Sequence, residues 1–156
     1  MSDVVRRPSV QLNSRLTHVN VLYLQLREKI MGLMSVRFGT NDLKRACAFY
    51  DATFTALGLG ENRVPMDMPV AIYRLPGGLH FMLAAPRDGQ AATHGNGDTL
   101  GFSASDAASV DRWHSAGVAN GGTCEGAPGV REAAGGRYGA YLRDPDGHKL
   151  CAYSAA

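Results

Sequence analysis

The feature that most constrains this chain is an internal repeat. The segment Ser35-Val-Arg-Phe-Gly-Thr40 and the helical pattern that follows it return in matching positions from Thr99 onward. A hairpin built on proline and glycine also occurs twice, first from Tyr73 to Ala84 and again from Tyr141 to Tyr153. Two copies of one supersecondary unit are therefore expected, because a single copy cannot cover its own apolar sheet face.

The first copy, residues 34–86, predicts a strand, a helix and about three further strands. Ser35 to Thr40 alternates, with Val36 and Phe38 on one face and Ser35, Arg37 and Gly39 on the other. Asn41 or Asp42 can cap the helix, whose apolar stripe ends at Gly58. Short strands are expected at 61–64, 70–75 and 79–84, because Pro65, Pro69 and the Pro76-Gly77-Gly78 turn divide this segment.

The second copy, residues 98–156, repeats this order after a breaker-rich linker from Pro86 to Gly97. It predicts a strand over 99–104 and a helix that Ser105 or Asp106 caps and that Gly117 and Gly121-Gly122 end. A strand or loop over 123–132 and a hairpin that turns at Asp144-Pro145-Asp146-Gly147 complete it.

The predicted fold class is α+β, with two βαβββ modules whose sheets enclose a cavity. Residues 1–33 have no clear period, so we expect an N-terminal extension followed by a single domain over 34–156.

Composition excludes several classes of function. The 156 residues carry 16 basic and 14 acidic side chains, and a net charge of +2 argues against nucleic acid or a membrane surface as the main partner. The three cysteines have no Cys-x-x-Cys spacing, which disfavours a disulfide framework and favours a reducing cytoplasm.

The repeat resembles the glyoxalase, bleomycin resistance protein and extradiol dioxygenase proteins, the vicinal oxygen chelate superfamily. The resemblance runs from Met34 to Tyr153. It is strongest in four segments: Thr40-Asn-Asp-Leu-Lys-Arg-Ala-Cys-Ala-Phe-Tyr-Asp51, Gly95-Asn-Gly97, Gly121-Gly-Thr-Cys-Glu-Gly-Ala-Pro-Gly129 and Arg143-Asp-Pro-Asp-Gly147. It implies a cup between curled sheets, a small-molecule ligand and a homodimer.

In that superfamily a divalent metal sits in the cup, held by His and Glu side chains near the first and last strands of each module. The corresponding positions here are Ser35, Met82, Thr99 and Cys151, none of which is His, Asp or Glu. His80 lies on the same side as Met82, but one imidazole cannot replace the three protein ligands that a catalytic metal usually has. We therefore expect no metal cofactor, with a divalent metal as the alternative.

Further candidates for ligand contact come from strand alternation and from the resemblance. Arg37 could bind a carboxylate or phosphate on the cup face, and Arg131 is a second candidate for an anion. Cys151 is expected to be an inert thiol. Four tyrosines in the strands are candidates to line the cup, and core and edge packing explains some of them equally well: Tyr73, Tyr138, Tyr141 and Tyr153.

The remaining histidines are not expected to act. His94 and His148 are expected to face solvent, and His114 is expected at a contact between helix and sheet.

Three functions stay open from the sequence. The first is binding of a small organic molecule in a metal-free cup, oriented by Ser35, Arg37 and Thr99. The second is a glyoxalase-type lyase or isomerase, or a dioxygenase-like enzyme, with an atypical metal site. The third is an interaction module whose cup is filled by side chains.

Overall fold

The computed structural model describes residues 32–60, 63–64 and 67–154. The chain divides at Leu33, and every described helix and strand belongs to the unit Met34–Ala156. The extension predicted for 1–33 and the beginning of the strand predicted at 61–64 lie largely outside the described residues.

The first module forms a four-stranded sheet, sheet A, with the order β1-β4-β3-β2. Its strands are β1 (Ser35–Gly39), β2 (Arg63–Val64), β3 (Val70–Arg74) and β4 (His80–Ala84), and helix α2 (Leu43–Ala56) follows β1. β1 runs parallel to β4, while β3 is antiparallel to β4 and to β2.

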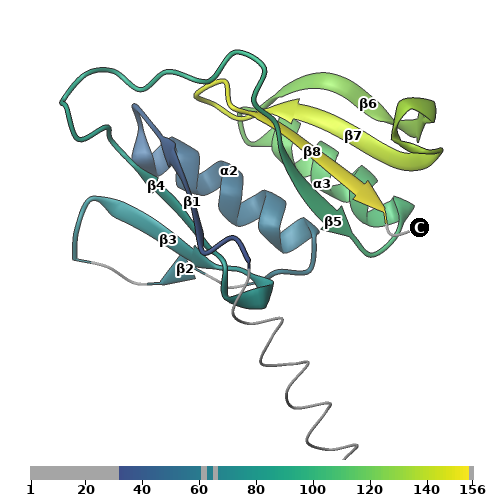
Figure 1. The fold of residues 1–156 in the computed structure, drawn as a ribbon, viewed down its shortest axis with the longest axis horizontal. Coiled ribbons are helices and arrows are strands. Elements are labelled where there is room, and N and C mark those ends of the chain that lie inside the picture. The colour runs from purple at the N-terminus through teal and green to yellow at the C-terminus, as the bar shows by residue number, and fades with distance from the viewer. Residues whose placement is uncertain (1–31, 61–62, 65–66, 155–156) are drawn as a thin grey trace, which may run out of the picture. The chain divides into compact units, whose positions relative to one another are not determined.

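The second module repeats this topology in sheet B, with the order β5-β8-β7-β6. Its elements are β5 (Leu100–Ala104), helix α3 (Ala107–Ala119), β6 (Thr123–Arg131), β7 (Arg137–Arg143) and β8 (Lys149–Ser154). Parallel pairing of β5 with β8 matches the pairing of β1 with β4. The predicted pair of βαβββ modules is confirmed (Figure 1).

Aspartates begin both helices. Asp42 accepts a hydrogen bond from the backbone N–H of Arg45 at 3.0 Å, and Asp106 accepts one from Ser109 at 2.7 Å. Each carboxylate thereby satisfies an N–H group that has no partner within its helix. Of the two alternatives predicted for each cap, Asp42 and Asp106 are the residues used.

Gly117 does not end the second helix, as the sequence predicted, but lies within α3, which continues to Ala119. A Cβ at this position would overlap Leu142 of sheet B and lie 3.2 Å from Phe49 of α2. Glycine is therefore needed for close packing of α3 rather than for a turn. The helix ends at Asn120, and Gly121 follows with φ of 91°.

One face of each sheet packs on the helices, and the two modules share a hydrophobic core. Its largest side chains are fully buried: Trp113, Tyr50, Tyr73, Phe49, Phe54 and Phe81. α2 and α3 also pack against each other. The opposite face of each sheet, here called its open face, carries no helix of the described unit (Figure 1).

The turn between β7 and β8 connects the two modules. Asp146 accepts hydrogen bonds from Thr40 Oγ1 at 2.6 Å, from Asn41 N at 3.0 Å and from Arg45 Nη2 at 3.3 Å. Asp144 accepts one from the buried Tyr50 hydroxyl at 2.7 Å. These contacts fix the second module's hairpin against the junction of β1 and α2.

Among the described residues, no helix has the length and apolar content that a membrane span requires.

Candidate functional site

The open face of sheet A carries the first group of predicted site residues. Because side chains alternate along a strand, Val36 and Phe38 pack toward the core and leave Ser35 and Arg37 on the open face. The same alternation buries Phe81 and Leu83 of β4. It places His80 and Met82 on the open face.

Strand register arranges these side chains in two rows. Ser35 pairs with His80, which pairs with Arg74 on β3, and this row is polar. The next row runs from Arg37 to Met82, Ile72 and Val64, and is apolar except for Arg37 at its edge. An apolar surface thus lies beside hydroxyl, imidazole and guanidinium groups.

A hollow of about 320 Å³ lies over these rows, here called the sheet A hollow. Its volume is within the usual range for small-molecule sites. None of the described residues that line it is acidic: Met34, Ser35, Val64, Ile72, Arg74, His80 and Met82. The hollow therefore combines an apolar floor with donors and positive charge.

Arg37 lies where two further hollows meet. One, of about 650 Å³, extends from Arg37 and Met82 over the linker residues 86–93. The other, of about 370 Å³, lies between Arg37 and the beginnings of β5 and β8. The guanidinium donates from Nη2 to Ala85 O at 3.0 Å and forms no ion pair with an acid of the described ranges.

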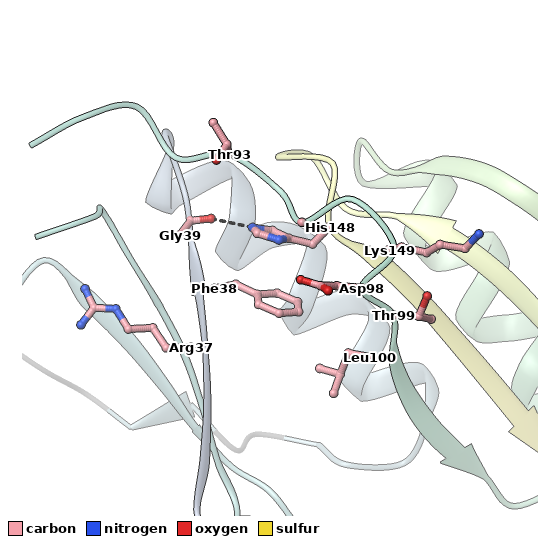
Figure 2. Close-up of a pocket in the computed structure, with 10 residues that line it drawn as sticks. Arg37, Phe38, Gly39, Thr93, Asp98, Thr99, Leu100, His148 and Lys149 are labelled. Carbon is pink, nitrogen blue, oxygen red and sulfur yellow. Dashed lines mark hydrogen bonds between the residues drawn. The ribbon is translucent and has the colours of Figure 1, made fainter. Parts of the chain in front are cut away.

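The seam hollow is the 370 Å³ space between β1, the linker and the beginnings of β5 and β8 (Figure 2). Phe38 and Leu100 supply apolar wall, and Thr93, Asp98 and Thr99 supply polar groups. The predicted residues Arg37 and Thr99, from different modules, both line it.

The open face of sheet B holds the remaining predicted residues. Tyr141 and Cys151 are register partners, and Tyr153 pairs with Gly139 in the next row. The hydroxyls of Tyr141 and Tyr153 hydrogen-bond to each other, and the Arg131 guanidinium lies 5.6 Å from the Tyr141 ring centre. The structure thus brings together four predicted residues: Arg131, Tyr141, Cys151 and Tyr153. Their side chains are already occupied by contacts within this group.

Charged groups on this face are also paired. Glu125 accepts hydrogen bonds from Arg143 Nε and lies 3.1 Å from Lys149 Nζ. These two partners lower the pKa of Glu125. Of the strand or loop predicted over 123–132, the structure has the strand, β6, and Glu125 binds side chains of β7 and β8.

Reactivity at Cys151 is opposed by its surroundings. Burial raises the pKa of the Cys151 thiol, with Lys149 acting weakly in the other direction. A protonated thiol is a poor nucleophile. The hydrogen bond with Tyr141 raises the pKa of Tyr153 to about 12, so this hydroxyl is a hydrogen-bonding group and not an anion near neutral pH.

Two of the four tyrosines proposed as cup lining face the other way. Tyr73 is 1% exposed, packs on Phe54 and donates to Asp51 Oδ1 at 2.9 Å. Tyr138 packs against the core and donates to Asp111 Oδ1 at 2.8 Å. The prediction was wrong for both, because strand register assigns them to the helix-covered face.

His148 was wrongly expected to face solvent. Its ring is stacked on Phe38 with a centroid distance of 4.2 Å, and its Nε2 lies 2.9 Å from the Gly39 carbonyl oxygen. The residue is 9% exposed. Because its partners belong to the first module, their approach could not be seen from the local turn sequence. His94, by contrast, is exposed.

The sheet A hollow also contains residues that the sequence reasoning did not select, namely Met34, Val64, Ile72 and Arg74. Alternation in the segment Val70-Ala-Ile-Tyr-Arg74 was the available signal, since burial of Ala71 and Tyr73 turns Ile72 and Arg74 to the other face.

The fold and these faces agree with a match between residues 32–152 and the model of the Glyoxalase/Bleomycin resistance protein/Dioxygenase superfamily. The chain belongs to this family.

Solved structures support the assignment. A glyoxalase/bleomycin resistance protein from Albidiferax ferrireducens T118 is 47% identical, with a TM-score of 0.72 over 79% of this chain and 98% of that one. Lactoylglutathione lyase from Agrobacterium tumefaciens, at 21% identity, covers 80% and 93% of the two chains with a TM-score of 0.55. The fosfomycin resistance protein FosX from Mesorhizobium loti, at 19% identity, covers 81% and 94% with a TM-score of 0.58. The last two show the fold alone. No curated protein matches the chain.

The residues at the positions of the family's metal ligands do not fit a divalent cation. Ser35 and Thr99 offer neutral hydroxyls, Met82 offers a thioether, and burial keeps the Cys151 thiol protonated by raising its pKa. In the described ranges, no three His, Cys, Asp or Glu side chains are grouped as a ligand set.

Proposed function

We propose that this protein binds a small organic anion with an apolar body in the sheet A hollow. The observation that carries the proposal is the arrangement of the two rows on sheet A. A flat or branched apolar group fits over Val64, Ile72 and Met82, while a carboxylate or phosphate meets Ser35, His80 and Arg74.

Charge distribution supports an anionic ligand. Arg74 makes no ion pair with an acid of the described residues, whereas Arg63 on the neighbouring strand β2 pairs with Asp51 at 3.2 Å. A guanidinium binds a carboxylate through two parallel hydrogen bonds, which fixes the orientation of the ligand. Arg37 at the edge of the apolar row offers a second positive group to a longer ligand.

The two sheets differ in their suitability for binding. On sheet B, the tyrosines, Arg131 and the Glu125 cluster contact one another, so a ligand there must displace existing interactions. On sheet A, no hydrogen bond joins Ser35, His80 and Arg74 to another described side chain. This favours sheet A as the primary site.

Isothermal titration calorimetry with 2-naphthoate and its uncharged analogue 2-naphthamide tests the proposal. The full chain is expected to bind one 2-naphthoate, and 2-naphthamide more weakly. Arg74→Gln should weaken 2-naphthoate binding by about tenfold or more, because a charge-assisted hydrogen bond contributes roughly 1.5–3 kcal/mol.

The matched control is Arg63→Gln, which removes a guanidinium whose ion pair with Asp51 lies on the helix side of sheet A. This variant should bind 2-naphthoate as the natural chain does. Equal losses in the two variants, or equal affinity for the acid and the amide, would contradict the proposal. Binding should also be the same with and without a chelator.

The homodimer implied by the family, the cytoplasmic location and the role of Arg131, Tyr141, Cys151 and Tyr153 as ligand contacts stay predictions.

A further inference from the structure

The seam hollow has a chemistry different from that of the sheet A hollow. It is lined by a carboxylate, two threonine hydroxyls, the apolar walls Phe38 and Leu100, and the imidazole of His148. Arg37 and Lys149 also line it, but Figure 2 shows both side chains pointing away from His148. Arg37 is bound to Ala85 O, and Lys149 is paired with Glu125.

The contacts of His148 determine which ring nitrogen carries its proton. Nε2 lies 2.9 Å from the carbonyl oxygen of Gly39, and a carbonyl oxygen can only accept. In the neutral ring Nε2 must therefore be the protonated nitrogen. Nδ1 is left with a free lone pair and is a hydrogen-bond acceptor.

No described residue uses that acceptor. His148 makes one ring hydrogen bond, through Nε2, and its Nδ1 is not among the fully enclosed polar atoms that lack a partner. Nδ1 is therefore not fully enclosed, and the residue that carries it lines the seam hollow.

The ring is also held rigidly in place. The ring is stacked on Phe38 with an angle of 12° between the two planes. The backbone of His148 is also held at both ends: its N–H donates to Asp144 Oδ1 at 2.9 Å, and its carbonyl oxygen accepts from Asp144 N at 3.0 Å. A ligand therefore meets an acceptor whose position is set before binding, which reduces the entropy lost on association.

From these observations we infer that the seam hollow is a second binding site, for a small uncharged ring compound that donates an O–H to Nδ1 of His148. The ring of this ligand would contact Phe38 and Leu100. A phenol combines such a ring with the O–H donor. Asp98 disfavours the anions that suit the sheet A hollow, so the two sites take different ligands.

Phenol and anisole are matched probes, because anisole has the same ring but no O–H donor. In an NMR titration of the ¹⁵N-labelled full chain, phenol should shift the amide signals of Phe38, Thr99 and Leu100 in a saturable way. Anisole should bind about tenfold more weakly, the effect of one neutral hydrogen bond. Equal binding of the two probes, or no saturable shift by phenol, would overturn the inference.

His148→Gln separates the acceptor from the structural role of the ring. The glutamine amide can still donate to Gly39 O, and its oxygen lies on the terminal amide carbon and not at the position of Nδ1. Phenol should therefore bind this variant no better than anisole. Should this variant not fold, Thr99→Trp fills the hollow without changing His148 and should abolish phenol binding. Full phenol affinity in a folded variant of either kind contradicts the inference.

Two further readouts keep this inference separate from the proposed function. Long-range ¹H–¹⁵N spectra of the histidine rings should show the Nε2–H tautomer for His148, and an Nδ1–H tautomer overturns the inference. Arg74→Gln should leave phenol binding unchanged even where it removes 2-naphthoate binding, since Arg74 does not line the seam hollow.

Discussion

Single residues show how burial, rather than residue type, decides chemistry in this chain. His114 of α3 has a ring nitrogen, Nε2, that is enclosed without a partner, and burial lowers the pKa of its imidazole. His148 of the β7–β8 turn is buried more completely, and its Nε2 has a partner. The two histidines therefore differ in both burial and partners.

His114 makes a testable contribution to acid sensitivity. Because its pKa is lower in the folded state than the usual 6.5, the unfolded chain takes up the proton more readily. The unfolding free energy is therefore highest above pH 6.5, where the ring is neutral in both states. It decreases as the pH falls below 6.5 toward the lowered pKa. His114→Leu should therefore reduce the loss of unfolding free energy between pH 7.5 and 5.

Urea denaturation at the two pH values measures this effect. His80→Leu is the matched control, because that side chain is exposed on the open face of sheet A. An unchanged pH dependence in His114→Leu would show that another group is responsible.

At the scale of elements, the contact between α3, α2 and sheet B depends on a residue without a side chain. Gly117 sits where Leu142 and Phe49 approach the helix backbone most closely. An added methyl group improves helix propensity by about 1 kcal/mol but overpacks the contact by roughly 1–3 kcal/mol. Packing is expected to outweigh propensity here because Leu142 and Phe49 are themselves fully buried.

Gly117→Ala should therefore lower the unfolding free energy by up to about 2 kcal/mol. Gly129→Ala in β6 is the control: its new methyl group meets no atom within 4 Å, and its change should stay within about 0.5 kcal/mol. Urea denaturation compares the two. A Gly117→Ala variant more stable than the natural chain would contradict this account of the helix contact.

Element order could be predicted from the sequence because the signals are local. Asp42 and Asp106 begin the helices, alternation marks β1 and β5, and Gly147 with φ of 92° turns the final hairpin. Gly117 misled the prediction because a glycine required by a long-range contact looks in sequence like a helix end.

The candidate site was predictable only in part. Ser35, Arg37, His80 and Met82 follow from period-two alternation and do lie on one face. The turning of Tyr73 and Tyr138 to the core follows the alternation of their own strands, which the prediction did not apply to them. The position of His148 against Phe38, in contrast, depends on how the two modules meet. Such contacts join residues far apart in the chain, and no local pattern encodes them.

At the scale of the whole described unit, two similar modules have acquired different surfaces. Asp144 and Asp146 fix the second module to the first through Tyr50, Thr40 and Asn41. Burial raises the pKa of Asp144, while the hydrogen bond from Tyr50 partly offsets that effect. Sheet B covers its open face with mutual side-chain contacts, and sheet A keeps a hollow with unpaired donors.

The most direct test of the proposed anion site is a crystal structure of the full chain with bound 2-naphthoate. The account predicts the naphthalene ring over Ile72 and Met82, with the carboxylate within hydrogen-bond distance of the Arg74 guanidinium. Density for the ligand on the open face of sheet B, with the sheet A hollow empty at saturating ligand, would contradict it.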